Sequence, residues 1–81
     1  MQNPHPMTDP KVKANEIVEK YREVLGLKYI HSRNAYIACA ISEVEGRIET
    51  LVEFNKIIPI SIKAAVEQLD AVLTELKNMN Q

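Results

Sequence analysis

The sequence predicts an all-α fold, a single small domain of three helices, and three observations lead to this class. Apolar side chains recur every three or four residues in three separate segments, which is the spacing of helices with one buried face. Residues that start or stop helices, among them Pro10, Gly26 and Pro59, stand between these segments. No segment alternates apolar and polar residues as a half-buried strand does. We therefore predict helices at about 10–25, 32–54 and 61–79, within one helical domain that spans 9–81.

The first helix is predicted from its start signals and its apolar stripe. Residues 1–8 include two prolines and little to bury, so we expect a flexible N-terminal arm. Asp9 can cap the helix, and Pro10 suits its first turn. Gly26 can adopt a positive φ, and we expect it to end the helix. The stripe consists of Ala14, Ile17, Val18, Tyr21, Val24 and Leu25.

The second helix has Ser32 as its predicted N-cap and an unusual first half. Residues 35–41 are apolar on every side, so we expect this half to be buried on every side. Gly46 lies in mid-helix, where glycine costs about 1 kcal/mol relative to alanine. It indicates a close crossing, a bend or simply a tolerated surface glycine. The main stripe consists of Ile37, Ile41, Val44, Ile48, Leu51 and Val52.

The third helix follows a short turn that contains Pro59, and Ser61 can cap it. Its stripe consists of Ile62, Ala65, Val66, Leu69, Val72, Leu73, Leu76 and Met79. The short turn predicts a long antiparallel hairpin of the second and third helices, with the first helix across or beside it. Three helices cannot easily cover a helix that is apolar all round, so we also expect the chain to form a homo-oligomer.

Composition excludes several classes of protein. The net charge of −1 is not that of a nucleic-acid-binding chain, and the third helix is acidic on balance, which argues against DNA. Cys39 is the single cysteine, so an internal disulfide is impossible. The chain shows neither a signal peptide nor an apolar run long enough for a membrane, and we expect a cytoplasmic protein without a membrane partner.

Nothing in the sequence assembles the parts of an enzyme. His5, His31 and Cys39 form no paired spacing that would bind a metal. Ser42, Ser61 and Cys39 have no histidine positioned to activate them. Glu45, Glu49 and Glu53 share one helix face, where an acidic ladder usually faces solvent. We therefore expect a protein that is not an enzyme and that uses no metal and no cofactor.

The segment from residue 20 to residue 36 is the candidate ligand site. It holds Lys20 and four further basic or imidazole side chains against a single acid, Glu23, with tyrosines and an amide between them. Cations pair with phosphate, tyrosine stacks on a base, and a helix N-terminus attracts an anion. The alternative is an ordinary connector with surface charges. The predicted ligand-binding residues are Arg22, Lys28, Tyr29, His31, Arg33, Asn34 and Tyr36.

Two stretches resemble short bacteriophage and prophage helical proteins of uncharacterised function. One is 35–49, Ala-Tyr-Ile-Ala-Cys-Ala-Ile-Ser-Glu-Val-Glu-Gly-Arg-Ile-Glu, which is similar to their middle helix with an Ala-x-x-Cys-Ala-Ile-x-x-Val-Glu pattern. The other is 14–21, Ala-Asn-Glu-Ile-Val-Glu-Lys-Tyr, which is similar to their first helix. This chain departs from the pattern at Gly46 and Arg47, and its last helix lacks their Tyr-Trp pair. The resemblance implies a viral or mobile-element protein, and no catalytic residue can be transferred from it.

Two functions remain open at this point. The first is a small phage-type binding protein that sequesters a phosphate-bearing, nucleotide-like ligand at residues 20–36. Its role would be that of a counter-defence protein in the host cytoplasm. The second is a protein–protein interaction module that blocks or scaffolds a host protein through the apolar start of the second helix or through the acidic ladder.

Overall fold

The computed structural model describes residues 9–58 and 61–79. It contains three helices, α1 (Pro10–Gly26), α2 (Arg33–Ile57) and α3 (Lys63–Met79), and these described residues include no strand. The all-helical, three-helix prediction is therefore confirmed. The predicted flexible arm at 1–8 and the breaker Pro59 lie outside the described residues.

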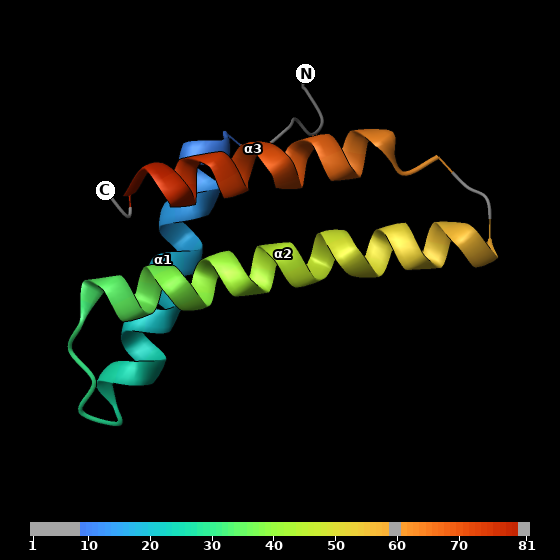
Figure 1. Cartoon of the computed structure of the whole chain (residues 1–81). Coiled ribbons are helices and arrows are strands. Elements are labelled where there is room, and N and C mark those ends of the chain that lie inside the picture. Colours follow the sequence, from blue (N-terminus) through green and yellow to red (C-terminus); the bar gives the residue numbers. More distant parts are fainter. Residues whose placement is uncertain (1–8, 59–60, 80–81) are drawn as a thin grey trace, which may run out of the picture.

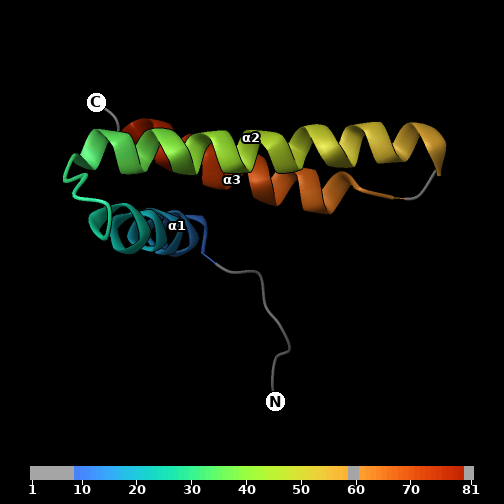
Figure 2. The ribbon, with the colours of Figure 1, turned by 90° about the horizontal axis from the view of Figure 1, so that it is seen from below.

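The three helices pack as a pair crossed by a third. In Figure 1, α3 runs back along α2 in the opposite direction, and α1 crosses both near one end of the pair. Figure 2 shows α1 almost end-on, lying against one side of the pair. Each helix contacts both of the others. No helix in this part of the chain is long and apolar enough to cross a membrane.

Local sequence explains where the helices begin. The Asp9 side chain accepts a hydrogen bond of 2.9 Å from the Lys11 backbone N–H, as a cap should, and Pro10 is the first helical residue. The Ser32 hydroxyl oxygen accepts from the Ala35 N–H at 3.2 Å. The predicted cap Ser61 is not next to its helix, because α3 begins at Lys63 and its first bond runs from the Val66 N–H to the Ile62 carbonyl.

The end of α1 differs from the prediction that Gly26 takes the positive φ. Gly26 has no positive φ, and Tyr29 has φ of 65° instead. The Tyr29 N–H donates to the Gly26 carbonyl and the Ile30 N–H donates to the Leu25 carbonyl, each at 3.0 Å. These two bonds form a Schellman motif in which Tyr29 is the left-handed residue. The turn thus closes three residues later than expected, on a residue for which this conformation is strained.

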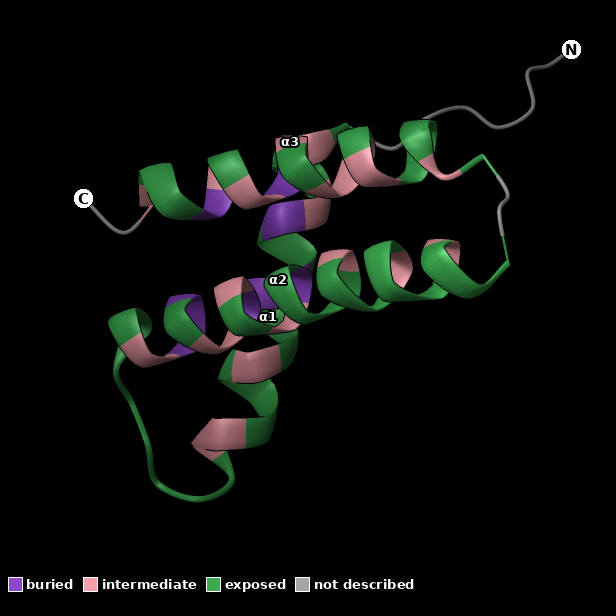
Figure 3. Ribbon diagram, turned by 45° about the vertical axis from the view of Figure 1, so that its right-hand side comes forward, coloured by how far each residue is buried: buried purple, intermediate pink, exposed green. Residues whose placement is uncertain are grey.

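The core lies where α1 crosses the pair, as the buried residues in Figure 3 show. It consists of Ala14, Ile17, Val18, Tyr36, Ile37, Ala40, Val44, Val72 and Leu76. No residue of 45–58 or 61–71 is fully buried. The expectation that 35–41 is buried on every side is wrong for the single chain, because Ala38 is exposed on the side that neither α1 nor α3 covers. Because α1 crosses the pair near one end, the other end of α2 and α3 has no third helix over it.

Candidate functional site

The predicted ligand-binding residues fall into three environments. Arg22 lies on α1, where its Nε donates to Glu19 Oε1 at 2.6 Å, and this bond raises the pKa of the guanidinium. Lys28, Tyr29, His31, Arg33 and Asn34 are all exposed in the connector and at the start of α2. Tyr36 belongs to the core.

Tyr36 does not fit the role of a stacking residue. Its side chain is 6% exposed, and its hydroxyl donates a hydrogen bond of 2.6 Å to the Ile30 carbonyl. The ring therefore packs between helices, and the hydroxyl ties the connector to α2. The sequence carried a signal for this burial, because Tyr36 also lies in the apolar run 35–41.

Tyr29 is the residue of this group best placed to meet a ligand. It is 88% exposed, and its positive φ costs of the order of 1 kcal/mol in a residue that has a Cβ. Leu27 beside it is 83% exposed. A strained backbone and an exposed large apolar side chain both lower the stability of a fold. Such features are concentrated at functional sites.

The charged side chains of the connector and of the start of α2 are all basic. Lys28, His31 and Arg33 form no ion pair with any acidic side chain of the described residues. From residue 24 to residue 42 the sequence contains no acid at all. The connector therefore presents uncompensated positive charge at the edge of the molecule, where it projects beyond the helices (Figure 1).

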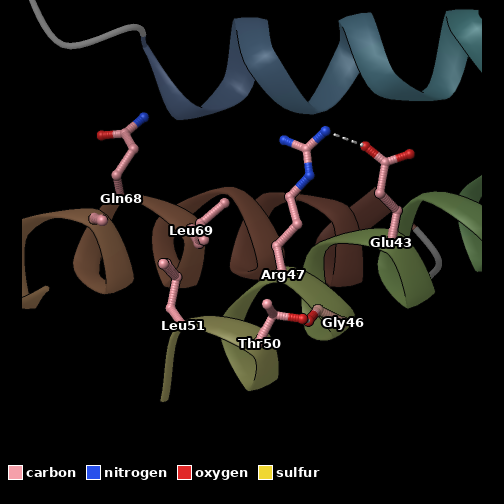
Figure 4. A pocket seen from close by; sticks show the side chains of 8 residues that line it. Glu43, Gly46, Arg47, Thr50, Leu51, Gln68 and Leu69 are labelled. Atoms are coloured by element: carbon pink, nitrogen blue, oxygen red, sulfur yellow. Dashed lines mark hydrogen bonds and ion pairs between the residues drawn. The ribbon is translucent and has the colours of Figure 1, made fainter. Parts of the chain in front are cut away.

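A second feature is an open groove between α2 and α3, beside the part of the pair that α1 covers. Its volume is about 720 Å³, and its lining comprises Glu43, Gly46, Arg47, Thr50, Leu51, Ala65, Gln68 and Leu69. In Figure 4, Leu51 and Leu69 approach each other from the two helices, while Arg47 and Gln68 rise on either side toward the level of α1. The groove has an apolar floor and a polar rim, which is the composition of a binding surface.

Glu43 forms a polar cluster at the edge of this groove. Its Oε1 accepts hydrogen bonds from Lys20 Nζ and from the Tyr21 hydroxyl, each at 2.7 Å. Arg47 Nη2 lies 3.0 Å from Oε2, but this buried oxygen accepts no aligned hydrogen bond from the described residues. The Lys20 ammonium also lies 5.0 Å from the centre of the Tyr21 ring. The cluster clips α1 to α2.

The environment of Glu43 sets two pKa values. Burial by itself would raise the pKa of Glu43, but the hydrogen bonds from Lys20 and Tyr21 and the charges of Lys20 and Arg47 outweigh it, and the pKa is lowered. The bond to Glu43, and then burial, raise the pKa of Tyr21. Glu43 is therefore ionised at neutral pH and Tyr21 is protonated, which fits a structural clip.

Other residues singled out by the sequence show no chemistry. Within 9–58 and 61–79, no group of three His, Cys, Asp or Glu side chains is placed to hold a metal ion. Cys39 is a free, half-buried thiol. In the acidic ladder, Glu45 lies 3.8 Å from Lys77 and Glu53 lies 3.1 Å from Lys56, so two of its three members already have cationic neighbours.

Comparison of the chain with protein-family models, with curated proteins and with solved structures gave no match.

Sequence reasoning missed the groove and the Glu43 cluster. One signal could have indicated the groove: Arg47, Leu51, Phe54 and Ile58 continue, at spacings of three and four, the stripe of α2 that begins with Tyr36 and Ala40. The partners of Glu43 on α1, Lys20 and Tyr21, lie more than twenty residues away, and no local spacing reveals them. Its neighbour Arg47 stands four residues further along α2, a spacing at which an ion pair can be predicted from the sequence.

Proposed function

We propose that this chain is a small non-enzymatic binding protein that holds a phosphate-bearing, nucleotide-like ligand at the connector between α1 and α2. The observation that carries the proposal is Tyr29, which is strained and 88% exposed among cations that pair with no acidic side chain of the described residues. A strained aromatic residue beside free positive charge suits a flat, anionic ligand.

The roles of the residues follow from their exposure. Lys28 and Arg33 neutralise the phosphate, the ring of Tyr29 stacks on the base, and His31 and Asn34 donate hydrogen bonds. Arg22 is already engaged by Glu19 and adds only long-range charge. The mechanism is stoichiometric binding without turnover.

We also propose a biological role for this chain and a way in which its copies assemble. The resemblance to phage proteins supports a counter-defence protein that sequesters a nucleotide signal in the host cytoplasm, with no DNA and no membrane as partner. We also propose that the chain forms a homo-oligomer through the antiparallel α2–α3 pair, which would bring several connectors into one assembly. The half of that pair left open by α1 supports this assembly.

Native mass spectrometry of the freshly purified protein tests the ligand. We expect added mass of a few hundred daltons per site, absent from the denatured protein. Titration with mononucleotides and cyclic dinucleotides should then show binding that Lys28→Glu with Arg33→Glu abolishes.

The matched control reverses two other charges. Lys11 and Lys63 are exposed on α1 and α3, form no ion pair with described residues and lie outside the connector. Lys11→Glu with Lys63→Glu changes the net charge equally and should leave binding intact. Equal loss in both double variants, or no loss in either, would contradict a site at the connector.

The second candidate function is a protein–protein interaction module. The open groove favours it, and so do Phe54, Ile57 and Ile58, which follow the groove-lining residues along α2 and are 43%, 79% and 47% exposed. The apolar start of α2 is a weaker contact surface, since its Tyr36, Ile37 and Ala40 are buried in the core of the chain itself. Capture of one stoichiometric host protein from lysate, lost in Glu45→Lys with Glu49→Lys, would favour the acidic ladder as its contact.

A further inference from the structure

We propose that the occupant of the open groove is a second copy of this chain, and that the two copies cross antiparallel at Thr50 of α2. This inference rests on the self-association proposed above and names its contact residues. A two-fold axis at Thr50 places each residue of α2 opposite the residue equally far on the other side. Gly46, four residues before Thr50, then faces Phe54 of the second copy, and Arg47 faces Glu53 of the second copy.

Gly46 provides the first argument. Apart from its chain neighbours and the backbone of its own helix, a Cβ built on Gly46 would have no atom of the described residues within 4 Å, so no contact with these residues requires a glycine at this costly mid-helix position. Gly46 lines the groove, and its open surface is where a large side chain of another molecule fits. The internal close crossing that would otherwise explain this glycine does not occur.

The apolar residues of the same face provide the second argument. Thr50, Phe54 and Ile57 follow Gly46 at spacings of three and four, so they share one side of α2. The Thr50 hydroxyl already donates to the Gly46 carbonyl at 2.9 Å, which leaves its methyl group to pack. Thr50 also lies between two hollows, the groove and a smaller one that Glu49, Thr50 and Glu53 line. This side of α2 therefore presents a large side chain at Phe54, a small one at Thr50 and an open space at Gly46 that can receive a large side chain.

Charge complementarity provides the third argument and favours a second copy over another partner. Arg47 and Glu53 flank the same face, one on each side of Thr50 along α2, and their side chains are 53% and 70% exposed. Each has one ion-pair neighbour in its own chain, Glu43 and Lys56, and its exposed part can also meet a charge of a second copy. The two-fold axis brings Arg47 of each copy opposite Glu53 of the other, so this pair of opposite charges occurs twice in the dimer. An unrelated partner would need to reproduce both the large side chain that enters the open space and the paired charges, whereas a copy of this chain has them already.

Sedimentation velocity across a range of protein concentrations tests the proposal, with far-UV circular dichroism of each variant as a check on folding. We expect a concentration-dependent dimer that Gly46→Leu weakens by about tenfold or more, equivalent to about 1.4 kcal/mol. The monomer should stay folded, because the space next to Gly46 is empty. Arg47→Glu and Glu53→Arg should each weaken the dimer, and the double variant should regain much of the loss.

Glu67→Arg is the matched control, since Glu67 is an exposed acid on α3 and makes the same change of charge. It should leave the dimer unchanged. A protein that stays monomeric up to about 1 mM, or an oligomer that Gly46→Leu leaves intact, would overturn the proposal. Nucleotide titration of the same variants separates the two questions: a dimer without ligand binding refutes only the connector site, and binding by a monomer refutes only the crossing at Thr50.

Discussion

The Tyr21 hydroxyl of α1 donates a hydrogen bond of 2.7 Å to Oε1 of Glu43 on α2, across 22 residues of sequence. The same oxygen accepts from Lys20, so two neighbouring residues of α1 converge on one carboxylate. Since the core is small and aliphatic apart from Tyr36, this cluster fixes the position at which α1 crosses the pair. That position decides which half of the pair stays open.

Glu43→Gln should lower the free energy of unfolding by about 1–3 kcal/mol at neutral pH, because a partly buried, charge-assisted cluster loses its anion. The folded pKa of Glu43 is below its ordinary value of 4.5, so its contribution is complete above that value and is lost as the pH falls through the lower folded pKa. Urea unfolding of both proteins should therefore show a difference that shrinks in acid.

Glu49→Gln is the control for that series, because Glu49 is exposed and makes no ion pair with a described residue. Its effect should stay within about 0.5 kcal/mol at every pH. A difference between Glu43→Gln and the wild type that grows toward acid would contradict the clip.

Tyr29→Gly should unfold at a higher urea concentration than Tyr29→Ala, by about 1 kcal/mol in free energy. Both variants remove the ring, but alanine keeps the steric cost of a φ of 65° and glycine relieves it. Both should lose nucleotide stacking equally. If alanine proved as stable as glycine, the left-handed conformation of this residue would be wrong.

Leu76→Ala and Leu27→Ala make the same chemical change at opposite extremes of burial. Leu76 is fully buried and Leu27 is 83% exposed. We expect a loss of about 2–5 kcal/mol for Leu76→Ala and less than about 0.5 kcal/mol for Leu27→Ala in thermal or urea unfolding. Similar losses in both would place the core elsewhere.

Tyr36→Phe should keep the ring in the core and remove only the bond to the Ile30 carbonyl. We expect a cost of about 1 kcal/mol and faster amide hydrogen exchange in the connector. Tyr29→Phe is the comparison, since the Tyr29 side chain is almost fully exposed. Unchanged exchange in Tyr36→Phe would mean that the hydroxyl does not restrain the connector.

Much of the secondary structure could be predicted from local signals. The caps Asp9 and Ser32 and the three apolar stripes depend on contacts within a few residues, and all three helices appear where those signals stand. The candidate site could be predicted only in part. Five of its seven residues are exposed near the connector, but Arg22 is engaged by Glu19 and Tyr36 is buried.

The sequence by itself determined that this protein is helical, where its first two helices start, and that the connector is basic, because those properties depend on spacing, capping and formal charge. Only the tertiary structure decided that Tyr29 closes the turn after α1, that Glu43 joins α1 to α2, and that residues 45–58 stay without a buried side chain. The physical reason is the crossing of α1. A stripe marks a face that can be buried, but which part of it is buried depends on a helix that is distant in the sequence.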